Sequence, residues 1–127
     1  MWRQNSLTTS DDSFIASDDD PVQSMKVGIR NHLLYTLAHD PTTAHGAHWW
    51  WATCMAVRDR ALAVSFTMMR AHREKNVRRV NYLSLEYLMG RLLENNLRNT
   101  GLYEAARQAL GEMGQDIDTI LNKEPDM

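Results

Sequence analysis

The residues best suited to chemistry lie near position 86, where an apolar run leads into a carboxylate, a glycine and an arginine. Residues 80–85 favour a short β-strand, because β-branched and aromatic side chains fit a pleated, half-buried surface. Glu86 follows this run directly, and Gly90 and Arg91 come next. Open α/β sheets place ligand-binding groups at the carboxyl ends of their strands. Glu86 is therefore a candidate pocket wall; the alternative is a structural ion pair with a nearby arginine such as Arg91.

The other chemically capable side chains do not form a recognisable site in the sequence. His45 and His48 are three residues apart and could share a helical face, but a metal site needs three or four ligands and no third is nearby. Cys54 lies on the apolar side of an expected helix, as a small buried hydrophobe would. The three tryptophans at 49–51 point about 100° apart on a helix, which favours a core or interface role over one sugar-stacking platform. We therefore assign no metal site.

A basic segment at residues 70–79 contains five Lys or Arg residues and one acidic residue. It could be an anion-binding patch. The simpler interpretation is a helix C-terminus, whose dipole favours cations, followed by a solvated loop. The segment lacks interleaved aromatic residues and the net charge is -2, so we expect no nucleic-acid partner.

Helices must position these residues. Asp20 and Pro21 are typical of a helix start, and Asp40-Pro41 is typical of a helix end. Between them an apolar stripe repeats every three or four residues, at Val22, Met25, Ile29, Leu33 and Leu37. A long helix is expected from about 47 to 74. One of its faces would carry Trp51, Met55, Leu62, Phe66 and Met69, and a wider flank would carry Trp50, Cys54, Val57 and Ala61.

The region after Glu86 also reads as helical. Leucines at 92, 93 and 97 suggest one helix, a stripe from Leu102 to Met113 suggests a second, and Asp116 is placed to cap a short third. The fold class is thus a mostly α-helical chain with one short strand at about 80–85. A single strand cannot satisfy its backbone groups, so it needs partner strands, from a larger parent protein or from self-association.

Composition sets broad limits on the chain. Its 127 residues fit one domain, and 43% are hydrophobic, which is ordinary for a soluble protein. One cysteine, no secretory signal and no membrane-spanning run make the cytoplasm the expected compartment and exclude a membrane partner. Residues 1–20 are rich in Ser, Thr and Asp, and we expect an acidic, flexible tail there.

The segment around Glu86 resembles the Y-L-S-L-E-F-x-x-G-R signature of the glycogen (α-glucan) phosphorylase family. The similarity continues on both sides and covers about Val22 to Asp126. The matching residues are Tyr82-Leu83-Ser84-Leu85-Glu86, Met89-Gly90-Arg91, Asn95-Asn96-Leu97, Gly101-Leu102, His32-Leu33, Tyr35-Thr36-Leu37 and Val57-Arg58-Asp59. Residues 21–127 would then be an incomplete N-terminal portion of the phosphorylase N-terminal domain.

The resemblance implies a parent α/β enzyme of two Rossmann-like domains, the GT-B glycosyltransferase architecture. That enzyme degrades glycogen or maltodextrin: it cleaves α-1,4-glucan with inorganic phosphate, releases α-glucose 1-phosphate and uses pyridoxal 5'-phosphate. The residue matching Glu86 lines its glucose pocket. The position matching Leu88 approaches its cofactor, and some relatives have tyrosine there.

Two hypotheses follow from the resemblance. The family's cofactor lysine and phosphate-binding basic residues have no counterpart in these 127 residues, so we expect this chain to contain no catalytic residue and to be inactive alone. The alternative is a stand-alone helical dimerisation or interaction module, because the segment matching about Val22 to Trp51 contributes subunit contacts in family homodimers.

Overall fold

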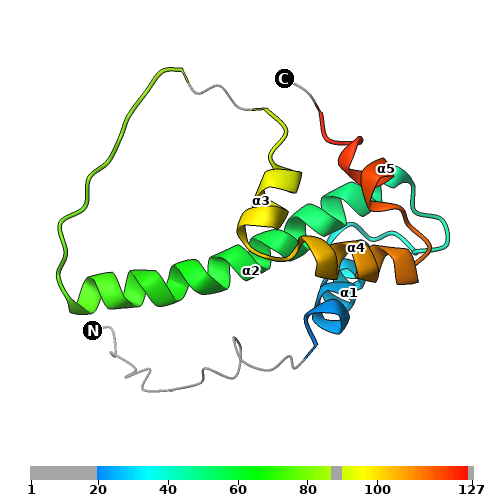
Figure 1. Ribbon diagram of the computed structural model, residues 1–127, viewed down its shortest axis with the longest axis horizontal. Helices are drawn as coiled ribbons and strands as arrows, with labels where there is room; N and C mark the ends of the chain where they lie inside the picture. Colours follow the sequence, from blue (N-terminus) through cyan, green and yellow to red (C-terminus); the bar gives the residue numbers. More distant parts are fainter. Residues whose placement is uncertain (1–19, 87–89, 126–127) are drawn as a thin grey trace, which may run out of the picture.

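A computed structural model describes residues 20–86 and 90–125, which are mostly helical (Figure 1). The elements are α1 (Pro21–Asn31), the π-helix η2 (His32–Thr36), α2 (Gly46–Glu74), α3 (Leu93–Asn99), α4 (Tyr103–Glu112) and α5 (Ile117–Leu121). The helices expected from the apolar stripes are confirmed. Except for Asp20, the tail expected at 1–20 lies outside the described residues.

Helix α1 begins where the sequence predicts, but the helical segment formed by α1 and η2 ends before the predicted Asp40-Pro41 boundary. The Asp20 carboxylate accepts a hydrogen bond from the Val22 backbone N–H at 2.9 Å, and Pro21 occupies the first turn. The chain then widens into η2 and leaves the helix at Ala38, whose φ of 55° lies in the left-handed region. The end predicted at Asp40-Pro41 is therefore wrong. Asp40 instead starts a separate turn, in which its carboxylate accepts a hydrogen bond from the Thr42 backbone N–H at 2.8 Å.

The long helix α2 runs through the whole described fold, and other elements pack mainly on its first half. The buried face carries Trp49, Ala52, Thr53, Ala56 and Val57. The face predicted from the larger apolar residues is wrong, since Trp51 is 47% exposed and Phe66 is 50% exposed. Small side chains explain the difference, because they let α1 approach closely. A Cβ placed on Gly28 would lie only 3.4 Å from the Ala56 Cβ.

The remaining helices close a core against α1 and the first half of α2. Helix α4 packs on α1, and α5 packs on α2. The most completely buried large side chains are Met25, Ile29, Leu33, Leu97, Leu110 and Ile120. Among the described helices, none has the length and apolar character needed to cross a lipid bilayer.

The strand predicted at 80–85 is not formed. This segment is an irregular, extended stretch that leaves the end of α2 and runs apart from the helical core (Figure 1). Val80 is 95% exposed and Leu83 is 91% exposed. A strand requires a neighbour for its backbone N–H and C=O groups, and the described part of the chain offers none. The apolar composition of the segment is real, but nothing within these residues covers it.

Candidate functional site

Glu86, the predicted pocket wall, lies exposed at the end of the extended segment. Its backbone is held locally: the Ser84 hydroxyl donates to the Glu86 carbonyl at 2.8 Å and accepts from the Glu86 N–H at 3.1 Å. This reciprocal pair forms a small turn at the point where the carboxylate leaves the chain. The structure therefore defines the local backbone of Glu86.

The alternative role for Glu86, an ion pair with Arg91, is not made among the described residues. Nη1 of Arg91 instead lies 3.5 Å from the Asn122 side-chain oxygen, beyond α5. Leu88, the position predicted to approach a cofactor, lies outside the described residues.

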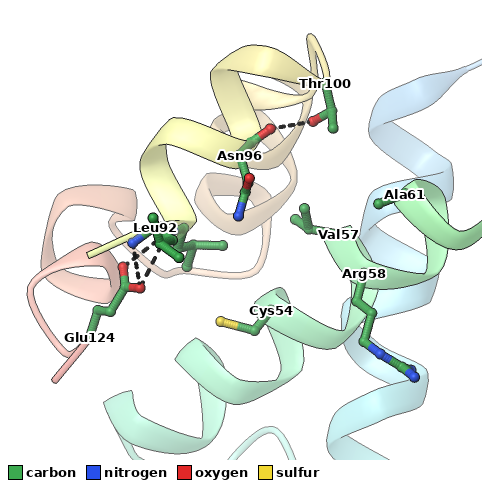
Figure 2. A pocket seen from close by; sticks show the side chains of 9 residues that line it. Cys54, Val57, Arg58, Ala61, Leu92, Asn96, Thr100 and Glu124 are labelled. Atoms are coloured by element: carbon green, nitrogen blue, oxygen red, sulfur yellow. Dashed lines mark hydrogen bonds between the residues drawn. The ribbon is translucent and has the colours of Figure 1, made fainter. Parts of the chain in front are cut away.

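A pocket of about 390 Å³ lies between α2, α3 and the segment after α5 (Figure 2). Its lining combines apolar side chains with a few polar ones: Cys54, Val57, Arg58, Ala61, Leu92, Leu93, Asn96, Thr100 and Glu124. Arg58 extends away from the other labelled side chains, and the Thr100 hydroxyl is used within α3, where it donates to the Asn96 carbonyl at 2.7 Å (Figure 2). The pocket is thus mainly the interface where α2, α3 and the segment after α5 pack together.

Glu124 is the charged residue that makes hydrogen bonds within this interface. Its carboxylate accepts hydrogen bonds from the Leu92 N–H at 2.8 Å and the Leu93 N–H at 3.1 Å. These N–H groups belong to the start of α3, where a helix leaves its first donors without internal partners. Glu124 therefore ties the end of the described chain to α3. Sequence reasoning missed this contact, because the partners are more than thirty positions apart.

Cys54 faces the same pocket as a neutral thiol. Burial raises the pKa of the Cys54 thiol to about 12, and the negative charge of Glu124 acts in the same direction. Since the thiolate is the nucleophilic form, this cysteine is inert near neutral pH. The prediction of a small buried hydrophobe is close: the side chain is half-buried and packs against the core.

The basic segment ends α2 as expected for a helix C-terminus. His72 and Arg73 occupy the last turn, and the helix ends at Glu74. Arg73 also lines a shallow hollow of about 320 Å³ together with Phe66, Met69, Arg70 and Arg79. The hollow lies on the open half of α2, where a positive charge near the C-terminus complements the helix dipole.

Three histidines meet at the other end of α2, which the sequence spacing did not reveal. The His39 and His48 rings stack with their centroids 3.7 Å apart, and the His45 ring lies 5.8 Å from that of His48. The turn at Ala38 brings His39 back onto these two residues, but as a stacked ring. No group of three or more His, Cys, Asp or Glu among the described residues is arranged to hold a metal ion.

The sequence is similar to part of known phosphorylases. Glycogen phosphorylase of Pasteurella multocida (strain Pm70) is 38% identical over 105 residues, which cover 83% of this chain and 13% of that protein. The protein of the same name from Haemophilus influenzae is 37% identical with the same coverage, and the liver form from Bos taurus is 34% identical. No protein-family model matches the chain. The chain thus spans about an eighth of the length of the relatives it matches.

Proposed function

This chain belongs to the glycogen phosphorylase family, and we propose that residues 21–127 supply the N-terminal portion of such an enzyme's N-terminal domain. The complete enzyme would release α-glucose 1-phosphate from α-1,4-glucan with inorganic phosphate. The observation that carries this proposal is the similarity over 105 residues, which covers 83% of the chain. The proposed parent is the α/β enzyme of two Rossmann-like domains, acting in the cytoplasm.

The structure gives this proposal a physical basis in the open half of α2 and the segment after it. Exposed apolar side chains gather there: Val64, Phe66, Met68, Met69, Val77, Val80, Leu83 and Leu85. In soluble proteins, extensive apolar exposure of this kind marks a surface that packs against another one. We propose that the rest of the phosphorylase domain covers it, with 80–85 pairing as a strand in a sheet.

Glu86 would then take a defined place. Once 80–85 is paired, the carboxylate would lie at the carboxyl end of a strand, where open α/β sheets bind ligands. We propose that it forms one wall of the glucose pocket. Hydroxyl groups of a sugar can donate to a carboxylate, which accepts through two oxygens.

Pyridoxal 5'-phosphate is the cofactor that family membership implies, and the residues described here do not fit it. A Schiff base needs a lysine in a pocket beside the substrate. The chain's three lysines are placed otherwise: Lys26 is ion-paired with Glu112 at 2.9 Å, Lys75 caps the end of α2, and Lys123 lies over Gly46. We therefore place the cofactor, and the phosphate chemistry it supports, in the remainder of the proposed enzyme.

The experiment is complementation. The chain would be co-expressed with a Pasteurella multocida glycogen phosphorylase from which the matching 105 residues have been removed, and glucose 1-phosphate release from maltoheptaose and phosphate would be measured with added pyridoxal phosphate. We expect no release by either part alone and release by the pair. A Glu86→Gln chain should join the pair and lower its turnover, whereas Glu94→Gln, at an exposed position of α3, should leave turnover unchanged. Release by the 127-residue chain alone, or none by the pair, would contradict the proposal.

The second candidate is a helical dimerisation module formed by about Val22 to Trp51. The observation in its favour is that α1 and the first half of α2 close a core with α4 and α5, as a stand-alone helical unit would require. Analytical ultracentrifugation discriminates between the two. A discrete dimer supports the module and the proposed homodimer, whereas a monomer or a polydisperse aggregate supports an incomplete domain with an exposed apolar face.

A further inference from the structure

The three histidines at the start of α2 form a contact that works only while His48 is neutral. The backbone N–H of His45, the residue before the helix, donates a hydrogen bond to Nδ1 of His48 at 3.1 Å. A ring nitrogen can accept a hydrogen bond only when it carries no proton. Protonation of His48 at Nδ1 would therefore place two N–H groups face to face and break this contact.

The stack of rings opposes protonation as well. His39 stacks on His48 at a centroid distance of 3.7 Å and an interplanar angle of 24°. His45 lies 5.8 Å away on the chain just before the helix. Each imidazolium that forms would repel its neighbours at short range, and all of them would lie at the positive end of the α2 dipole. Acid thus introduces positive charges close together at the N-terminal end of α2, where the helix dipole disfavours them.

The charged groups around the stack do little to offset this repulsion. Asp40 follows His39, but its carboxylate is held by the Thr42 hydroxyl and backbone N–H. Lys123, after α5, packs over Gly46 and adds a positive charge at this end of α2. Partial desolvation lowers the pKa of His48 below its usual value, and charge on His39 and His45 lowers it further.

From this geometry we propose that His39, His45 and His48 form a pH-sensitive clasp, which holds the connection 38–45 on the start of α2 when neutral and releases it in mild acid. The clasp joins η2 to α2, because the His39 backbone N–H also donates to the Leu33 carbonyl at 2.9 Å. Release would therefore loosen the first turn of α2 and the connection together, while the α1–α4 core stays folded.

The sign of the effect follows from linkage. Because His48 is harder to protonate when folded, the unfolded first turn binds more protons in the pH range around the ordinary histidine pKa. The clasp is thus fully formed above the unfolded pKa and weakens as pH falls through it. This is the window in which histidine acts as a switch.

The test is amide hydrogen exchange of the full chain, corrected for intrinsic rates, at about pH 7.5 and about pH 5.5. Peptides covering 39–50 should lose protection several-fold in acid, while peptides in α4 should not. His48→Gln keeps a side-chain acceptor without a titrating group, so its first turn should lose much less protection in acid than that of the wild type. His72→Gln, near the other end of α2, is the matched control and should behave like the wild type.

A second variant keeps the test decisive if His48→Gln does not fold. His39→Gln removes the stacking partner and should reduce the acid effect without abolishing it. Equal loss of protection in acid for the wild type and the variants, or no loss in the wild type, would overturn the clasp. An NMR titration in which the pKa of His48 lies above the ordinary histidine value would overturn it too.

Discussion

The two halves of α2 have similar apolar content but very different surroundings. In the first half, small residues such as Ala52 and Ala56 are buried against α1, and Trp49 is buried with them. In the second half, Phe66 and Met69 remain about half exposed, and the extended segment beyond them leaves Val80 in solvent. One helix therefore belongs to a closed core at its start and to an open surface at its end.

The comparison shows that an apolar side chain is not buried by its composition alone. Burial needs a partner of complementary shape. The described elements that pack on α2 are α1, η2, α3 and α5, and they lie toward its first half (Figure 1). The second half carries residues suited to a core, and no element in residues 20–86 or 90–125 covers them. Membership in a family whose relatives extend far beyond the 105 matched residues offers a physical source for those elements.

The largest contrast should come from truncating one apolar side chain in each half. Ile29→Ala removes a fully buried side chain from the closed core and should cost about 2–5 kcal/mol in the free energy of unfolding. Val64→Ala, at an exposed site on the open half, should change it by less than about 0.5 kcal/mol. Urea denaturation followed by circular dichroism measures both. Equal losses would show that the two halves are covered alike.

The next largest effect concerns Glu124, which joins α3 to the closed core. Glu124→Ala leaves the Leu92 and Leu93 N–H groups without this acceptor and should destabilise the chain by about 1–3 kcal/mol. Glu124→Gln, which retains one oxygen acceptor, should cost less. Chemical denaturation of the two variants provides the comparison. If both variants match the wild type, α3 does not depend on this contact.

A smaller effect is expected at the cap of α5. The Asp116 carboxylate accepts from the Thr119 backbone N–H at 2.9 Å and from its hydroxyl at 2.8 Å, and these hydrogen bonds hold the pKa of Asp116 below its usual value. Its contribution is therefore complete above the unfolded pKa and is lost as pH falls through the lowered folded pKa. Asp116→Ala should lower Tm by a few degrees at neutral pH and by less near pH 3.

The control for this prediction is Asp118→Ala, in the same helix but outside the cap. Its Tm change should be smaller at neutral pH. A loss for Asp116→Ala that grows in acid would contradict the assigned role of the carboxylate.

The smallest effect is expected for the surface ion pair between α1 and α4. Lys26 Nζ lies 2.9 Å from the Glu112 carboxylate, and both side chains are partly exposed. Glu112→Gln should lower Tm only slightly, and added salt should reduce the difference, because exposed pairs are screened. Glu104→Gln removes a pair within α4 alone and serves as the comparison. A loss as large as that of Ile29→Ala would mean that charge, not packing, closes this half.

Local signals in the sequence predicted most of the helices, and long-range contacts decided the rest. The caps at Asp20 and Asp116 and the long helix near 46–74 depend on neighbours within a turn, and they are confirmed. Periodicity alone could not say which face of α2 is buried, because apolar residues such as Trp51 and Ala52 lie on different faces. The close approach of α1 favours burial of the face with the smaller side chains. The strand at 80–85 depends on partners that the described residues do not include.

The candidate site shows the same division. Glu86 could be selected from its position after an apolar run, but its pocket role depends on pairing that this structure does not contain, and it stays a prediction. The His39–His48 stack and the Glu124 contact with α3 arise from chain reversals, which no residue spacing records. Sequence reasoning finds a chemical group more readily than its partners.

The most direct test of the two-halves account is amide hydrogen exchange along the chain, alone and in complex with the remainder of a phosphorylase. We expect slow exchange in α1, α4 and the first half of α2 in both samples. Peptides covering about 62–86 should exchange quickly in the free chain and become protected only in the complex. Strong protection of 62–86 in the free chain, or no gain on mixing, would contradict the claim that this half is completed by another surface.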